Sequence, residues 1–182
     1  MKINTFLAIV LAGICYMILP FLILLIKNEK AKKTISIITL AAFVCILLVG
    51  VWGSNNFSKK EISIGFDFSG KWCDKTMKWD FQNITTFDLV INLVMLFPIG
   101  IFAFDFLKNK KLWQKLLSLF AIGLFCGSFI EFSQYILPIP RSVQFSDIVF
   151  NTISVVVGGM ICWFYQFVIS KICKSKTDET AE

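Results

Sequence analysis

Five long runs of apolar residues divide the chain, and short polar segments separate them. Each run reaches about 20 residues or more, the length that an α-helix needs to cross the hydrocarbon core of a bilayer. The pattern predicts an all-α fold, a polytopic transmembrane helix bundle that forms a single membrane domain over residues 1–182. The expected spans lie near residues 3–26, 34–53, 88–107, 116–137 and 148–170.

Composition supports a membrane protein. Hydrophobic residues make up 57% of the chain and charged residues only 16%, whereas about a quarter of the residues in a soluble domain are charged. The net charge is +6, but the lysines stand beside the apolar runs and do not form a basic helix or stripe. We expect a multi-pass protein of the cell membrane with no nucleic-acid partner.

The first apolar run has a competing interpretation as a signal peptide. It is longer than the usual apolar region of such a peptide, so we expect it to be retained as a span. The lysine-rich segments 27–33 and 108–115 and the start of the C-terminal tail should be cytoplasmic. This orientation puts the N-terminus outside, the C-terminus inside and the loop of residues 54–87 on the extracytoplasmic side.

Local patterns add details to these spans. Apolar residues alternate with small or polar ones from Ile62 to Phe68, a period of two that is typical of strand-like or interfacial backbone. Trp72 and Trp79 of the same loop fit a cover at headgroup depth, with a substrate lid as the alternative. The polar C-terminal tail is expected to be disordered at its end.

Three further features concern the helices themselves. Pro98 and Gly100 should loosen the third span near its middle, because proline lacks the backbone N–H. The pair Gly158 and Gly159 should let neighbouring helices approach closely. Asp105, near the lysines, is expected to snorkel or to be a paired interfacial charge.

Several kinds of site are excluded. The chain has no histidine, which removes histidine-based zinc sites and catalytic triads. Four of the six cysteines lie inside apolar runs, and Cys73 and Cys173 are expected on opposite sides of the membrane, so no disulfide is predicted. No metal site and no cofactor are predicted.

Polar residues inside the spans are the candidates for function, because ionisable groups in a membrane are costly unless they face the protein interior. They come in helically spaced groups near the outer ends of spans three to five. Arg141, the only arginine of the chain, lies on the loop beside them. The groups are Asp88 with Asn92, Glu131 with Gln134, and Asp147 with Asn151.

The ordered set of these residues, together with Phe97-Pro98-x-Gly100 and Gly158-Gly159, resembles the VanZ-like family of bacterial membrane proteins. The resemblance covers residues 88–159. Ser154 departs from the glycine that the family commonly has soon after the asparagine, so helix packing is expected to differ there. The resemblance implies an association with resistance to glycopeptide antibiotics such as teicoplanin in Gram-positive bacteria.

Our first hypothesis is an outer-leaflet polar pocket that binds or modifies an envelope lipid or a lipid-linked cell-wall precursor. Glu131 and Asp147 are the candidate catalytic residues if a bond is broken, which the sequence leaves open. Arg141 would clamp a phosphate or carboxylate with both prongs of its guanidinium. The candidate substrate-binding residues are Arg141, Gln134, Asn92, Asn151 and Asp88.

Three alternatives stay open. A transporter or flippase would use carboxylates for proton coupling but would need a polar path continuing inward. A non-catalytic membrane scaffold would use Arg141 to bridge Glu131 and Asp147. A divalent cation could also bind the acids, although their spacing matches no calcium-loop motif. The oligomeric state is not predicted.

Overall fold

A computed structural model describes residues 2–55, 64–66, 86–137 and 143–179, with side chains described over 13–49, 89–137 and 143–172. Arg141, Cys73, Trp72 and Trp79 lie outside these ranges, and Asp88 and Cys173 are described by their backbone alone. The expectations that rest on their side chains therefore stay predictions.

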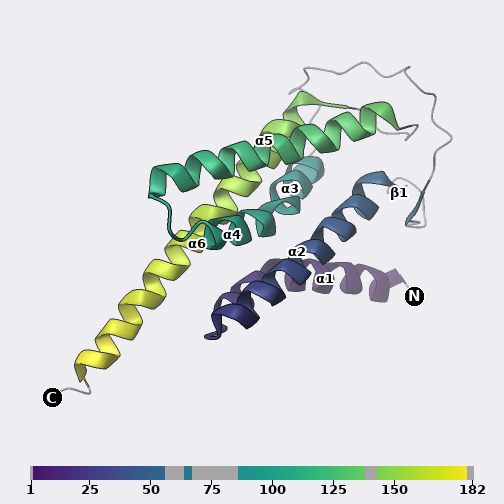
Figure 1. Ribbon diagram of the computed structural model, residues 1–182. Helices are drawn as coiled ribbons and strands as arrows, with labels where there is room; N and C mark the ends of the chain where they lie inside the picture. The colour runs from purple at the N-terminus through teal and green to yellow at the C-terminus, as the bar shows by residue number, and fades with distance from the viewer. Residues whose placement is uncertain (1, 56–63, 67–85, 138–142, 180–182) are drawn as a thin grey trace.

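The described residues are largely helical, with one short strand pairing among them (Figure 1). Strand β1 pairs with β2 in an antiparallel register that puts Gly53 opposite Phe66 and Asn55 opposite Ile64. The alternation from Ile62 to Phe68 is thus confirmed as a strand over Ile64–Phe66. The elements are α1 (Lys2–Leu24), α2 (Glu29–Trp52), β1 (Gly53–Asn55), β2 (Ile64–Phe66), α3 (Thr86–Met95), α4 (Phe97–Phe106), α5 (Leu112–Ile136) and α6 (Phe145–Glu179).

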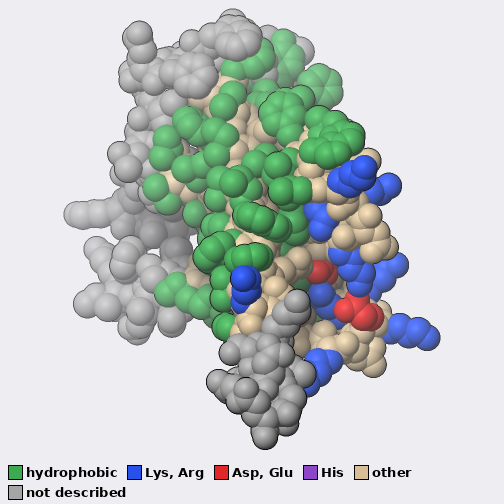
Figure 2. Space-filling model, turned by 90° about the vertical axis from the view of Figure 1, so that its left-hand side faces the viewer, with side chains coloured by type: hydrophobic (Ala, Val, Ile, Leu, Met, Phe, Trp, Pro, Cys, Tyr) green, Lys and Arg blue, Asp and Glu red, His purple; other side chains and the backbone are tan. Residues whose placement is uncertain are grey.

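Four segments of the described chain are long and apolar enough to cross a membrane, namely Glu29–Val49, Leu89–Phe106, Leu112–Ile136 and Phe145–Ile172. Gly13–Leu24 of α1 is a shorter apolar helix within the same described part. Many large hydrophobic side chains on these segments are exposed, among them Phe125, Phe129 and Phe132 of α5. Such a surface suits contact with lipid. Figure 2 shows hydrophobic side chains over much of one face, with lysines and acids gathered along one side.

Two helices extend beyond the spans that the apolar runs predict. Helix α2 begins at Glu29, five residues before the expected start at residue 34, because Asn28 caps it. The Asn28 Oδ1 accepts hydrogen bonds from the N–H groups of Lys30 and Ala31, each 3.1 Å long, as a helix N-cap does. Helix α6 continues to Glu179, beyond the expected end at residue 170, since residues 160–179 contain neither glycine nor proline to stop it.

The third span is broken at Leu96, where α3 ends and α4 begins. Pro98 lies in the first turn of α4, the place in a helix that tolerates a missing N–H. The Ile99 N–H bonds to the Leu96 carbonyl at 3.1 Å and leaves the Met95 carbonyl for the Tyr16 hydroxyl, which donates to it. The predicted loosening near Pro98 is confirmed. The hydrogen bond from Tyr16 supplies the Met95 carbonyl with a donor, which lipid chains cannot do.

Helix α6 packs along both α4 and α5, and its neighbours approach closely at glycines. A Cβ placed on Gly158 would lie 2.2 Å from the Phe97 carbonyl oxygen, and one on Gly159 would lie 2.3 Å from Leu119 Cδ1. The predicted close approach at this glycine pair is therefore confirmed. Around it lies an apolar core that includes Leu96, Ile101 and Val155, each 0% exposed.

Candidate functional site

Glu131 lies in the interior near the end of α5, with 2% of its surface exposed. Its Oε2 accepts a 2.9 Å hydrogen bond from the backbone N–H of Gln144, the residue just before α6. The first N–H groups of a helix have no partner within the helix, and they favour a nearby negative charge. Glu131 therefore supplies an acceptor at the start of α6.

The register between α5 and α6 explains this contact. Gly123, Gly127 and Glu131 are spaced by four residues and so share one face of α5. A Cβ on Gly123 would lie 2.8 Å from Thr152 Cα, and one on Gly127 would lie 3.1 Å from the Ile148 carbonyl oxygen. The two helices thus run antiparallel in close contact, and the same step brings Glu131 to the start of α6.

Asn151 lies on α6 at this contact and is fully buried, with 0% exposure. A Cβ on Gly127 would lie 3.2 Å from Asn151 Cβ. Within the described part of the chain, neither the Oδ1 nor the Nδ2 of Asn151 has a hydrogen-bond partner. An unsatisfied amide in an apolar environment costs on the order of 1–3 kcal/mol.

The other predicted residues of these two helices lie around the same junction. Gln134 is buried, with 4% exposure, one turn beyond Glu131 on α5. Asp147 is half-buried, and its N–H donates to the Gln144 carbonyl at 3.2 Å. The Gln144 side chain also accepts a 3.2 Å hydrogen bond from the buried Ser146 hydroxyl. The structure therefore brings Glu131, Gln134, Asp147 and Asn151 to one junction of α5 and α6. We call it the outer junction, after the side of the membrane on which the lysine pattern predicts it.

Helix α3 reaches the same depth through its register with α6. The Ser154 hydroxyl donates to the Leu93 carbonyl at 2.6 Å, and the Gln166 amide donates to Asp105 at 3.0 Å, so partners in both pairs are 61 residues apart. This register puts half-buried Asn92 about two residues, or ~3 Å, from Asn151 along the helix axis. The backbone of Asp88 lies one turn further out on α3.

Ser154, where the sequence departs from the family pattern, accounts for this packing. Its hydroxyl is fully buried and bonds to α3, so helix α6 is held there by a hydrogen bond between helices. Arg141 lies outside the described residues, so both its predicted role as an anion clamp and the alternative in which it bridges Glu131 and Asp147 stay predictions.

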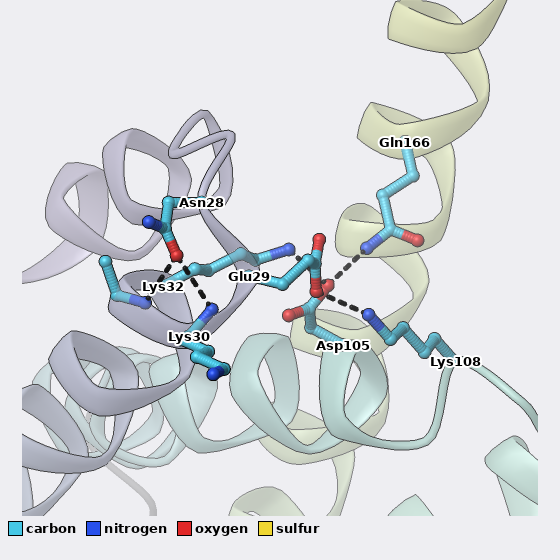
Figure 3. A network of polar contacts seen from close by, with 8 residues as sticks. Asn28, Glu29, Lys30, Lys32, Asp105, Lys108 and Gln166 are labelled. Carbon is cyan, nitrogen blue, oxygen red and sulfur yellow. Dashed lines mark hydrogen bonds and ion pairs between the residues drawn. The ribbon is translucent and has the colours of Figure 1, made fainter.

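A second polar cluster lies at the opposite end of α4, and the sequence pattern missed most of it (Figure 3). Asp105 forms a 3.0 Å ion pair with Lys32 of α2 and accepts a 3.0 Å hydrogen bond from Gln166 of α6. Lys32 and Asp105 are both 9% exposed. The prediction that Asp105 is paired is confirmed. We call Lys32, Asp105 and Gln166 the lysine-side cluster.

Two further lysines border this cluster. Lys108 forms an exposed ion pair with Glu29, and the hydrogen bond to this carboxylate raises the pKa of Lys108. Lys115 is buried, and its Nζ lies 4.2 Å from the centre of the Phe104 ring, a cation–π contact. Sequence reasoning missed Lys32 because it assigned segment 27–33 to a loop, although the helix signal at Asn28 was present.

The outer junction contains hydrogen-bonding and acidic side chains that are largely buried. Asn151 can both donate and accept, and Glu131 can hold or release a proton. Among the described side chains, no group of three acidic or cysteine residues is placed to hold a metal ion, so the divalent-cation alternative gains no support there. The four cysteines with described side chains, at 15, 45, 126 and 162, are free thiols.

Comparison with known proteins identifies the family. No curated protein and no solved structure matches the chain. A family model described as VanZ/LLP1 matches residues 6–166, a longer stretch than the 88–159 that the motifs cover, and one that includes α2 and most of α1. The chain belongs to the VanZ/LLP1 family of membrane proteins.

Proposed function

We propose that this protein of the cell membrane binds an envelope lipid or a lipid-linked cell-wall precursor at the outer junction, from the outer leaflet. By this binding it contributes to glycopeptide resistance of the teicoplanin type in a Gram-positive bacterium. Glu131 and Asp147 serve as acid or base if a reaction occurs, and Arg141, Gln134, Asn92 and Asp88 help to hold the headgroup.

One observation carries the proposal. The Asn151 amide is fully buried, lies one turn of α6 beyond Asp147, and has no hydrogen-bond partner among the residues that the structure describes. A buried polar group without partners lowers stability, and such groups in membrane segments usually mark functional sites. A ligand headgroup that hydrogen bonds to Asn151 gives this destabilising residue a role.

Two alternatives remain as outcomes of the test. The bond from Gln144 N–H to Glu131 favours a scaffold, since a carboxylate at a helix start also has a purely structural use. A transporter needs a polar route to the lysine-side cluster, whereas buried apolar side chains such as Leu96, Ile101 and Val155 lie between the two clusters.

Replacing Asn151 with leucine tests the proposal. Leucine is similar in volume but has no polar atoms, so Asn151→Leu should raise stability by about 1–2 kcal/mol and abolish resistance. Thermal unfolding of the purified protein in detergent measures the first effect. The inhibitory concentration of teicoplanin for cells that express the protein measures the second.

Thr152→Val is the matched control on the neighbouring position. Thr152 is buried, and its hydroxyl donates to the Ile148 carbonyl of its own helix at 2.7 Å, so valine should preserve resistance. If Asn151→Leu lowers stability, Asn151 is a structural residue. If it raises stability and resistance persists, the outer junction is not a ligand site.

A further inference from the structure

An apolar groove runs between α5 and α6 on the side of these helices that is exposed to lipid. Its volume is about 330 Å³. Phe120 and Leu124 form the α5 wall, and the α6 wall includes Ile148, Val149, Ile153 and Val157. All but Ile148 of these six side chains are exposed on the surface of the described structure.

The groove begins at the outer junction. Val149 follows Asp147 by two residues, about 3 Å along the axis, and Ile148 packs on Gly127 beside Asn151. From Ile148 to Val157 the α6 wall rises about 14 Å. This length is close to half of the ~30 Å hydrocarbon core, that is, to one leaflet.

The shape and the lining of the groove suit a hydrocarbon chain. Its volume of about 330 Å³ extends over ~14 Å of length, so the groove is elongated. Its walls are apolar side chains, which make dispersion contacts with an extended hydrocarbon chain. The helix segments that form the groove are among those apolar enough to span a membrane, where acyl chains surround them.

We infer that this groove holds one acyl chain of a membrane lipid whose headgroup lies at the outer junction. The inference rests on the proposed function and narrows its ligand to a lipid that carries a hydrocarbon chain. The chain is already in an apolar phase before it binds, so the groove favours it through dispersion contacts and not through removal from water. Its preference over ordinary surrounding lipid should therefore be modest.

Photolabelling tests the inference on the intact protein. The purified full chain is placed in vesicles of phosphatidylglycerol and phosphatidylethanolamine that contain a phosphatidylglycerol with a diazirine on one acyl chain, and adducts are mapped by mass spectrometry. Adduct yields on Leu124, Val149 and Ile153 should exceed those on the exposed residues Phe129 and Ile161, outside the groove, by about fivefold. Moving the diazirine toward the chain end should shift adducts from Val149 toward Val157.

A groove-filling variant with a matched control completes the test. Val149→Trp should lower the groove yields to those of surrounding lipid, while Ile161→Trp, on the same helix but outside the groove, should leave them unchanged. Equal yields across all exposed residues, or no shift with diazirine depth, would overturn the inference.

Photolabelling and the resistance of Asn151→Leu together distinguish a wrong acyl-chain site from a wrong proposed function. If labelling is even while Asn151→Leu still removes resistance, the acyl-chain site is wrong and the headgroup site stands. If labelling is concentrated while Asn151→Leu keeps resistance, the groove binds a chain and the proposed function is wrong.

Discussion

Buried polar side chains in this protein differ in whether their hydrogen bonds are complete. The hydroxyls of Tyr16, Thr152 and Ser154 each donate to a backbone carbonyl. The Asn151 amide and the Ser36 hydroxyl have no hydrogen-bond partner in the described ranges of the chain. Hydrogen bonds between helices stabilise a membrane protein by modest amounts. Buried polar groups without a partner therefore mark positions that lower its stability.

Breaking the buried ion pair of Lys32 and Asp105 should lower the stability of the protein strongly. Removing one partner leaves an uncompensated buried charge, so Lys32→Ala should lower the free energy of unfolding by about 3–5 kcal/mol. The double variant Lys32→Ala with Asp105→Ala should recover much of this loss, as thermal or denaturant unfolding in detergent can measure.

The exposed pair of Lys108 and Glu29 provides the control for this cycle. Lys108→Ala should leave the unfolding midpoint nearly unchanged, because exposed ion pairs contribute little. A double variant that is less stable than Lys32→Ala alone would show that the two charges do not depend on each other.

For single residues, the sequence predicted burial inside the protein wherever the depth of a polar residue in its span makes exposure to lipid costly. Glu131 and Gln134 were expected inside the protein, and both are buried. The partners of a residue could not be predicted in the same way. Whether Asp105 pairs with Lys32 or with another nearby lysine depends on how α2 packs against α4, and no periodicity in either segment contains that information.

At the scale of helices, glycine determines how closely α6 approaches its neighbours. Gly100, Gly158 and Gly159 lie where a side chain would meet the opposing backbone or Leu119. Small residues at such crossings let dispersion contacts and hydrogen bonds form between spans. The Ser154 bond to α3 depends on this approach.

Adding a methyl group at Gly158 should separate α4 from α6. Its Cβ would lie 2.2 Å from the Phe97 carbonyl oxygen, so Gly158→Ala should destabilise the protein by about 1–3 kcal/mol through overpacking. Gly13→Ala is the control, because nothing lies within 4 Å of its Cβ, and it should be neutral or slightly stabilising. Equal unfolding midpoints for the two variants would contradict the packing described for α6.

The helices themselves were largely predictable, because an apolar run of sufficient length has few other structures available in a bilayer. Pro98 predicted the weak point of the third span. The start of α2 and the end of α6 lie outside the predicted spans, since the apolar runs stop before the helices do. Polar residues continue a helix wherever a cap such as Asn28 or the lack of a breaker permits it.

At the scale of the whole molecule, two polar clusters lie on opposite sides of an apolar core. The outer junction joins α5 and α6, and the lysine-side cluster joins α2, α4 and α6. Helix α1 is tied to the core by the Tyr16 hydroxyl and by Phe21, whose ring lies 6.5 Å from that of Phe97. The family match from residue 6 agrees with a fold in which α1 and α2 belong with the later helices.

The central claim is that the outer junction faces the outer leaflet, which the lysine-rich segments predict through the positive-inside rule. Cysteine labelling in intact cells tests it directly, with variants that keep only Cys73 or only Cys173. A membrane-impermeant maleimide should label the Cys73 variant in intact cells and the Cys173 variant only after permeabilisation. The reverse pattern would put the outer junction on the cytoplasmic side and contradict the binding of an envelope lipid from outside.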